Sequence, residues 1–260
     1  MNSRTILITG ASSGIGRALA RRFARNGSRL ILVARRRERL EALADELGSS
    51  AMALSPIIED LTSDGACERI AAQLEQQGAK IDVLVNNAGV GEYGEFASQS
   101  LPAVKAMLTL NLTSLVELTH RVLPDMLACG NGHVVNIAST AAFQPTPYFA
   151  AYGASKAFVM NFSMALWYEL KNRGVSVTCI CPGPVATEFF DRGGLEGQKQ
   201  AFLKTGMTPE RVAEAAYRAV AGRRSLVIPG WLNRLGAIAP RFAPVRLVTR
   251  ATALLLKPRH

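Results

Sequence analysis

Short apolar runs alternate with amphipathic stretches along most of the chain, which predicts alternating strands and helices. The predicted strands are apolar and rich in β-branched residues, and they cover residues 5–9, 29–34, 50–54, 82–86, 133–138, 175–180 and 226–228. The predicted helices have apolar residues at steps of three and four, and they cover residues 14–26, 36–47, 62–77, 98–128, 151–172 and 209–221. Thr62 is a suitable N-cap for its helix, while Pro102 can begin the long helix and Pro124 can bend it.

This order of elements predicts the fold class. Continuously apolar strands between helices indicate a parallel sheet that is covered on both faces. Right-handed crossovers then give a single doubly wound, Rossmann-like parallel sheet of the α/β class. We expect residues 1–230 to form this domain and residues 231–260 to be a basic C-terminal extension of it. Ligands of such sheets bind at the carboxyl ends of the strands, so site residues are sought there.

Composition excludes several classes of protein. The 260 residues are 48% hydrophobic and 19% charged, which rules out a disordered chain, a coiled coil and a collagen-like repeat. No apolar run approaches the ~18 residues of a membrane span, and the run after Arg4 is too short for a signal peptide. The four cysteines are too sparse for a disulfide framework and lack the spacing of a zinc site. We therefore expect a cytoplasmic protein with reduced thiols and no metal.

The net charge of +10 is concentrated toward the C-terminal end. Residues 231–260 contain no acidic residue, and their basic residues are Arg234, Arg241, Arg246, Arg250, Lys257 and Arg259. Apolar residues at helical steps predict a basic amphipathic helix over residues 241–256, with Pro240 and Pro244 near its start. Its apolar stripe either packs on the domain or a partner subunit, or makes peripheral contact with an anionic membrane. No recognition motif accompanies the charge, so we do not expect nucleic acid binding.

The turn after the first strand carries the first candidate site. Residues 9–16 read TGASSGIG, and their three glycines allow positive φ angles and close approach of a phosphate group. The helix that begins near Gly14 directs free N–H groups toward a pyrophosphate. A glycine-rich turn without a ligand is the alternative, but the context of strand, turn and helix favours a dinucleotide.

Further motifs follow the later strands. Residues 86–89 read NNAG, residues 152–156 read YGASK, and residues 182–187 read PGPVAT. Together with the TGASSGIG turn, and in the same order, these motifs resemble those of the short-chain dehydrogenase/reductase family over residues 5–228. The resemblance implies a catalytic set of Asn111, Ser139, Tyr152 and Lys156, in which the sequence shows no departure from the family's pattern.

The chemistry of Tyr152 and Lys156 can also be argued from their spacing. The two residues lie four apart in a predicted helix and therefore share a face. We expect the ammonium group to favour the phenolate and to lower the pKa of Tyr152 from about 10, so that Tyr152 exchanges a proton near neutral pH. Ser139 would hydrogen-bond the substrate oxygen. The resemblance implies that Lys156 holds the nicotinamide ribose and that Asn111 anchors a water. A surface helix pair is the alternative for Tyr152 and Lys156.

The end of the second strand indicates which cofactor is used. An acidic residue there would bind the 2′-hydroxyl of NAD, but Ala34 is followed by Arg35, Arg36 and Arg37. Guanidinium groups suit a 2′-phosphate, so we expect NADP(H), with Arg35 and Arg36 at the phosphate and Arg37 and Arg39 solvated. The residues expected at the cofactor are Gly10, Ser12, Ser13, Gly14, Ile15, Arg35, Arg36, Asp60, Leu61, Asn87, Ala88, Gly89, Tyr152, Lys156, Pro182, Gly183, Val185 and Thr187.

These residues predict an NADP(H)-dependent carbonyl reductase or alcohol dehydrogenase. It would transfer a hydride between nicotinamide and a small-molecule ketone, aldehyde or secondary alcohol. Aromatic residues after Ser139 and Thr187, among them Phe149, Phe189 and Phe202, favour a lipophilic substrate, with ordinary loop packing as the alternative. An NADP(H)-binding regulatory protein with little turnover is the second functional alternative. Related proteins often pair through the helices that correspond to residues 98–128 and 151–172, so we expect a homodimer or homotetramer.

Overall fold

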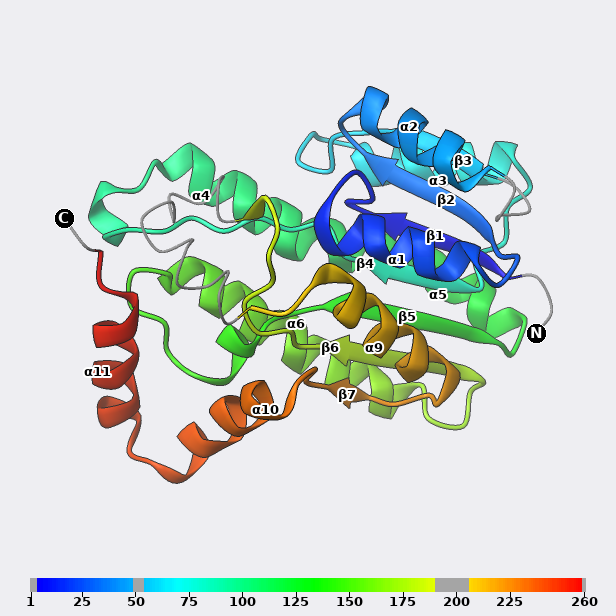
Figure 1. The fold of residues 1–260 in the computed structure, drawn as a ribbon. Helices are drawn as coiled ribbons and strands as arrows, with labels where there is room; N and C mark the ends of the chain where they lie inside the picture. The colour runs from blue at the N-terminus through cyan, green and yellow to red at the C-terminus, as the bar shows by residue number, and fades with distance from the viewer. Residues whose placement is uncertain (1–3, 49–53, 190–205, 259–260) are drawn as a thin grey trace.

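The computed structural model describes residues 4–48, 54–189 and 206–258 of the chain. A parallel sheet runs through the described part, and helices cover both of its faces (Figure 1). Its strands are β1 (Thr5–Thr9), β2 (Arg29–Ala34), β3 (Leu54–Ile58), β4 (Val83–Asn86), β5 (Gly132–Ile137), β6 (Val175–Ile180) and β7 (Leu226–Val227). Their order across the sheet is β3-β2-β1-β4-β5-β6-β7, and every neighbouring pair is parallel. The predicted doubly wound α/β fold is confirmed.

Alternate side chains of the central strands belong to two separate cores. The α-helices that surround the sheet are α1 (Gly14–Ala24), α2 (Arg37–Leu47), α3 (Ala66–Gln76), α4 (Leu101–Leu108), α5 (Ser114–Ala128), α6 (Ala150–Glu169) and α9 (Pro209–Ala221). Ile6 and Ile8 of β1 are buried with residues of α1, α2 and α9 on one face. Leu7 is buried with residues of α3 and α5 on the other. Because successive side chains point to opposite faces, a strand covered on both faces must be apolar throughout.

The direction of winding reverses next to β1. From β1 the chain moves outward through β2 to β3, and it then returns to β4 on the other side of β1. The loops that follow β1 and β4 therefore separate at the carboxyl edge of the sheet, which is where ligands of open α/β sheets bind. Gly10 and Asn87 begin these two loops.

The third strand lies further along the chain than predicted. Residues 49–53 lie outside the described residues, and β3 pairs with β2 from Leu54 opposite Leu30 to Ile58 opposite Ala34. Pro56 lies inside this strand and cannot donate a ladder hydrogen bond, a loss that an edge strand tolerates. The prediction that this strand ends at residue 54 was wrong, because its pairing with β2 continues through Pro56 to Ile58.

The helix after β3 also begins later than predicted. The structure starts α3 at Ala66, with Gly65 as its N-cap at φ 71°. Thr62 is not the cap, because its backbone N–H and its hydroxyl both donate to Asp60 Oδ1, at 2.9 and 2.8 Å. Thr62 thus closes the turn after β3 and holds Asp60 at the edge of the sheet.

The long helical stretch predicted over 98–128 is divided by a π-helical turn at Thr109–Thr113. Pro102 lies in the first turn of α4, as predicted, and Pro124 lies inside α5. By length and composition alone, Leu101–Ala128 could cross a membrane, contrary to the expectation from apolar run length. Its apolar residues in α5, such as Leu118 and Val122, are instead buried against the sheet. The stretch is therefore part of the helix layer.

The C-terminal extension forms two helices rather than the single predicted one. Helix α10 (Trp231–Ile238) follows β7, and a 3₁₀ turn at Ala239–Phe242 leads to α11 (Val245–Leu256). Pro244 is the N-cap of α11, so this helix begins after the second proline and not at residue 241. Helix α11 lies at the end of the molecule that also carries α4, and the amino-terminal ends of β1 and β5 lie at the opposite end (Figure 1).

Candidate active site

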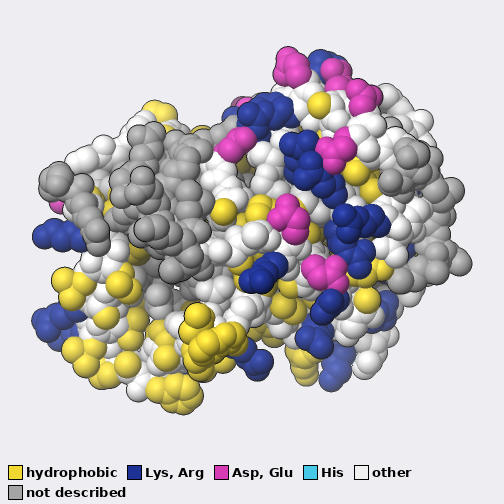
Figure 2. Space-filling model, in the orientation of Figure 1, with side chains coloured by type: hydrophobic (Ala, Val, Ile, Leu, Met, Phe, Trp, Pro, Cys, Tyr) yellow, Lys and Arg dark blue, Asp and Glu magenta, His cyan; other side chains and the backbone are white. Residues whose placement is uncertain are grey.

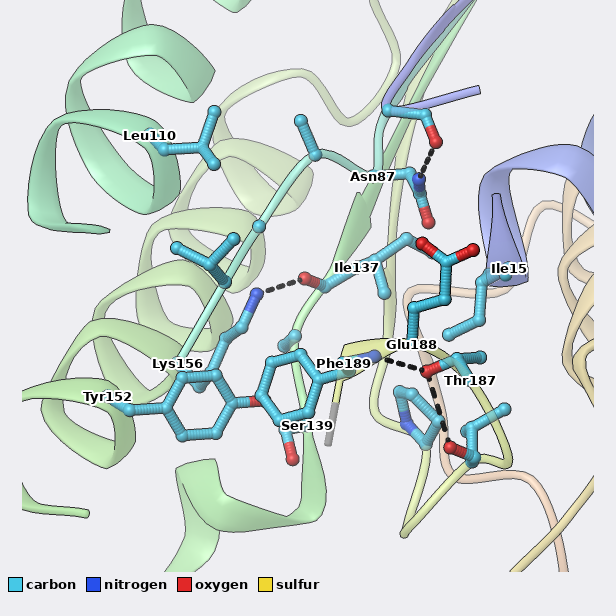
Figure 3. A pocket seen from close by; sticks show the side chains of 18 of the residues that line it. Ile15, Asn87, Leu110, Ile137, Ser139, Tyr152, Lys156, Thr187, Glu188 and Phe189 are labelled. Carbon is cyan, nitrogen blue, oxygen red and sulfur yellow. Dashed lines mark hydrogen bonds between the residues drawn. The ribbon is translucent and has the colours of Figure 1, made fainter. Parts of the chain in front are cut away.

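A cavity of about 860 Å³ lies at the carboxyl edge of the sheet. All of the site residues expected from the sequence line it, with the exception of Asn111. They come from the loops after β1, β2, β3, β4, β5 and β6 and from α6, so segments far apart in sequence form one wall. Figure 3 shows Ser139, Tyr152 and Lys156 close together, with Ile15 and Thr187 on the opposite side.

The glycine-rich turn has the backbone that a phosphate group requires. Gly10 and Gly14 have φ angles of 65° and 51°, in the left-handed region that favours glycine. A Cβ atom added to Gly16 would lie 2.2 Å from the carbonyl oxygen of Gly10, so only glycine fits where α1 packs on the turn. The turn therefore brings the N-terminus of α1 into the cavity wall, and these residues fit a dinucleotide pyrophosphate.

Thr9 and Asn87 join the two loops at the point where the winding reverses. The hydroxyl of Thr9 accepts hydrogen bonds from the backbone N–H groups of Asn87 and Ala88, each at 3.0 Å. The side-chain amide of Asn87 donates to the carbonyl oxygens of Thr9 and Gly10, at 2.9 and 3.3 Å. Thr9 was not predicted as a site residue, although its position before the glycine turn is a usable signal.

Tyr152 and Lys156 lie on one face of α6, and both are buried. The ammonium group of Lys156 donates to the carbonyl oxygen of Ile137 at 3.0 Å and lies 5.8 Å from the centre of the Tyr152 ring. Burial lowers the pKa of Lys156 from 10.5 to about 8. The contact with Ile137 fixes the lysine at the end of β5, beside the tyrosine (Figure 3).

The expected lowering of the Tyr152 pKa is wrong for the chain itself. Burial raises this pKa from 10.0 to about 12, and hydrogen bonding with the Ser139 side chain acts in the opposite direction but is the smaller effect. The physical reason is that the free-energy cost of removing the phenolate from water exceeds the stabilisation that the surrounding side chains provide. The neutral, proton-donating phenol is thus the resting form of Tyr152.

Ser139 and Asn111 reach this cluster in different ways. Ser139 follows β5 and caps a 3₁₀ turn, with its hydroxyl accepting from the backbone N–H of Ala141 at 3.1 Å. Asn111 lies in the π-helical turn, and its side-chain amide bonds both backbone groups of Val90, at 3.1 and 3.0 Å, and the hydroxyl of Ser155. Asn111 therefore sits behind the cavity wall and ties α6 to the loop after β4. Single π-helical turns are frequent at functional sites.

The arginines after β2 line the same cavity as Tyr152, and β1 and β4 lie between β2 and β5 in the sheet. Arg35 is half exposed and pairs with Asp60 at 3.3 Å. Arg36 is more buried, and its guanidinium group donates to the Ser12 hydroxyl from Nε and Nη2, at 3.3 and 3.1 Å, and to Glu188 Oε2 from Nη1 at 2.8 Å. Arg39 is exposed at the start of α2, as expected, and it also pairs with Glu188.

Aromatic side chains pack around the ring of Tyr152. The ring centres of Phe149 and Phe189 lie 4.7 and 5.3 Å from that of Tyr152. Phe202 lies outside the described residues. The wall is completed by α11 through Thr252, Leu255 and Leu256, and the Tyr93 hydroxyl donates to the Leu256 carbonyl oxygen at 2.5 Å. Packing of this helix on the domain was one of the predicted alternatives, but its place in the cavity wall was not predicted, because a contact between α11 and a distant loop is not a local pattern.

Comparison with known proteins identifies the family. A family model described as "short chain dehydrogenase" matches residues 4–194. The NADP-dependent 3-hydroxy acid dehydrogenase YdfG of Salmonella typhi is 39% identical over 218 residues, which cover 82% of this chain and 87% of that protein. The chain therefore belongs to the short-chain dehydrogenase family and is an oxidoreductase.

Solved structures extend the likeness to the C-terminal helices. A short-chain dehydrogenase from Sphingobium yanoikuyae in complex with NADPH has a TM-score of 0.82 at 34% identity and covers 99% of this chain and 97% of its own. The bulky-bulky ketone specific alcohol dehydrogenase from Comamonas testosteroni has a TM-score of 0.78 at 30% identity and covers 100% of this chain and 96% of its own. The expectation of NADP(H) agrees with the relatives that are named with this cofactor.

Proposed function

We propose that this chain uses NADP(H) to interconvert a lipophilic ketone or aldehyde and the corresponding alcohol, with a secondary alcohol as the product of a ketone. The observation that carries the proposal is the position of Tyr152. Its ring packs against Phe149 and Phe189 in the wall of the same cavity that the glycine-rich turn and α11 line. A proton donor at this position can serve a carbonyl group that lies next to a bound dinucleotide.

NADP(H) supplies or accepts the hydride when bound, and the side chains of the cluster handle the proton. During reduction, the Tyr152 hydroxyl donates its proton to the carbonyl oxygen, for which its neutral resting form is ready. Ser139 donates a hydrogen bond to the same oxygen as negative charge develops there. In the oxidation direction Tyr152 must become a phenolate, and a positive charge on Lys156, one helical turn away in α6, would favour that form.

Two further roles complete the proposal for the cluster. Lys156 holds the ribose beside the nicotinamide, since its ammonium group is anchored at the end of β5 by a single carbonyl oxygen and keeps donors for other partners. Asn111 positions this region from behind, through its bonds to Val90 and Ser155, and anchors a water that links Lys156 to solvent. Residues 1–230 supply the dinucleotide-binding and catalytic domain, and residues 231–260 are an extension of it.

The preference for NADP(H) over NAD(H) rests on Arg35 and Arg36. Both line the cavity at the end of β2, where an acidic residue would serve a 2′-hydroxyl group. A guanidinium group can bind the 2′-phosphate with two parallel hydrogen bonds. Arg36 is the better placed of the two for specificity, because Ser12 fixes its orientation against the glycine-rich turn.

The substrate class follows from charge around the reacting end of the cavity. Among the lining residues that the structure describes, the cations are Arg35, Arg36 and Lys156, and the two arginines follow β2, which β1 and β4 separate from β5 in the sheet. A 3-hydroxy acid, which the Salmonella typhi relative is named for, would require a cation for its carboxylate near Phe149 and Phe189. Aromatic and aliphatic walls there suit a bulky ketone instead.

A panel of substrates tests this function. Aryl alkyl ketones and long-chain ketones, with 3-hydroxy acids and serine as the contrasting set, should be assayed with NADPH and NADH side by side. We expect kcat/KM to be highest for lipophilic ketones with NADPH. Higher kcat/KM for the hydroxy acids would refute the substrate class. NADPH binding without turnover of any carbonyl compound would favour the alternative of a regulatory protein.

We also propose that the C-terminal extension makes peripheral contact with an anionic membrane surface. Figure 2 shows apolar side chains gathered over α10 and α11 with Lys and Arg beside them, and Phe242 and Leu254 are 86% and 80% exposed. The segment contains no acidic residue. Binding to phosphatidylglycerol vesicles should be lost at high salt and in the variant Arg246→Glu/Arg250→Glu, whereas Lys171→Glu/Arg173→Glu should bind normally. Equal binding to neutral phosphatidylcholine vesicles would contradict a role for charge.

A homodimer or homotetramer in the cytoplasm completes the proposal. Helices α5 and α6 are the proposed interface, and α6 exposes Phe158 and Tyr168 to solvent. Phe158 also stacks on Phe162 at 5.8 Å between ring centres, which makes a flat apolar surface. Light scattering of the purified chain should give a dimer or larger, and Tyr168→Arg should shift it toward the monomer.

A further inference from the structure

Glu188 brings a negative charge into the part of the cavity where the 2′-phosphate is proposed to bind. It follows Thr187 in the loop after β6, yet its carboxylate reaches the residues that follow β2. One oxygen accepts from Arg36 Nη1 at 2.8 Å, and the other pairs with Arg39. These two arginines lower the pKa of Glu188 to about 2, so the carboxylate is charged throughout the working range of pH.

Arg36 thereby connects three separate loops. Its Nε and Nη2 atoms donate to Ser12 in the glycine-rich turn, while its Nη1 atom donates to Glu188. A guanidinium group presents only a few donor directions, and a carboxylate and a phosphate seek the same ones. A phosphate group that binds Arg36 must therefore either replace Glu188 or accept a like charge close by.

We propose that Glu188 is a specificity-determining residue that opposes the 2′-phosphate. This inference rests on the proposed function, in which Arg36 receives the phosphate of NADP(H). By sharing Arg36 with the phosphate, Glu188 weakens the binding of NADP(H) and leaves the binding of NAD(H) nearly unchanged. The strength of NADP(H) binding is thus set by a balance between the arginines after β2 and a carboxylate after β6.

If the contact between Glu188 and Arg36 instead helped NADP(H) to bind, the substitution of Glu188 would change the affinity for NADP(H) in the opposite direction. If Glu188 served to orient Arg36 toward the phosphate, its removal would weaken the binding of NADP(H). Ser12 already holds Arg36 through two nitrogen atoms, so the orientation of the guanidinium group has a second support. The charge of Glu188, by contrast, cannot favour a phosphate at any position of the guanidinium group.

Glu188→Gln tests the inference, because it removes the charge and keeps the shape. Dissociation constants for NADPH, NADH and 2′,5′-ADP should be measured by fluorescence and calorimetric titration, without turnover. We expect NADPH and 2′,5′-ADP to bind about fivefold more tightly to the variant, as for a partly exposed charge pair, and NADH to change less than twofold. The gain should shrink as the salt concentration rises.

Glu46→Gln is the matched control. Glu46 is also held by two arginines, Arg17 and Arg21 at 2.8 and 2.6 Å, and its pKa is also about 2. Glu46 lies on α2 and is not among the residues that line the cavity, so its variant should bind every nucleotide as the wild type does. Glu188→Ala should behave as Glu188→Gln does if charge is the cause.

Two results would overturn the inference, and they can be told apart. A wild-type chain that prefers NADPH, together with a Glu188→Gln variant that binds NADPH equally or more weakly, would refute the role of Glu188 alone. A wild-type chain that binds 2′,5′-ADP no better than ADP would refute the proposed phosphate site, and the role of Glu188 with it. Thermal unfolding of each variant checks that the fold is intact.

Discussion

Lys156, to which we assign a role in the proposed reaction, is expected to lower the stability of the folded protein. Its side chain is 5% exposed, and burial lowers its pKa from 10.5 to about 8. At pH 7 this difference corresponds to a cost of about 3 kcal/mol for keeping the ammonium group charged in the folded state. The unfolded chain binds the proton up to pH 10.5, so stability should rise between about pH 8 and pH 10.5, as the folded state releases the proton first.

The variant Lys156→Met removes this cost and keeps a side chain of similar length. Loss of the hydrogen bond to Ile137 destabilises the variant by about 1 kcal/mol and so reduces this gain. The free energy of unfolding at pH 7 should therefore rise by about 1–3 kcal/mol. Urea unfolding, followed by circular dichroism at pH 7 and pH 10, measures this quantity. The gap between variant and wild type should be smaller at pH 10, and turnover should fall by orders of magnitude.

The control is Lys105→Met, which removes an exposed lysine from α4. Its free energy of unfolding should stay within about 0.5 kcal/mol of the wild-type value. A Lys156→Met variant that is less stable than the wild type at pH 7 would refute the reasoning, and so would a gap that widens with pH. In either case Lys156 would be held by interactions that outweigh its burial.

Three other predictions concern the remaining parts of the site. Tyr152→Phe removes the transferable proton and should lower kcat by orders of magnitude in single-substrate assays, with NADPH affinity in titrations almost unchanged; near-normal turnover would exclude Tyr152 as the donor. Arg35→Asp should move the NADPH-to-NADH preference toward NADH by about 1–3 kcal/mol in kcat/KM, and a wild type that uses both equally would remove the basis for it. Truncation after Pro240 removes the wall formed by Thr252 and Leu256 and should raise KM for a bulky ketone far more than for a small one; an unfolded truncation product would instead assign α11 to stability.

Local patterns in the sequence were sufficient for the sheet and for most of the cavity wall. Strands buried on both faces have to be apolar at every position, and a phosphate-binding turn has to contain glycine where φ is positive, as at Gly10 and Gly14. Each of these requirements acts on residues that are close together in the sequence, so it produces a recognisable local pattern. The positions of β1, β2 and α1 could be predicted closely for this reason.

The features that the sequence did not predict depend on partners far along the chain. Glu188 meets Arg36 across 152 residues, and Tyr93 meets Leu256 across 163. The π-helical turn at Asn111 contains residue types that are equally common in an α-helix, so the pattern could not locate it. Pro56 was misleading for a related reason, because its tolerance depends on the edge position of β3.

The pKa of Tyr152 shows most clearly why spacing alone was insufficient. Four residues of separation placed Lys156 beside Tyr152, as expected, but the ammonium group is turned to Ile137 and is 5.8 Å from the ring centre. Burial then moves the pKa values of the two groups toward their neutral forms, to about 12 and about 8. Ionisation of Tyr152 therefore needs additional positive charge, which oxidised nicotinamide provides on binding. The chain by itself therefore favours the protonated tyrosine, which is the form that the proposed reduction of a carbonyl group needs.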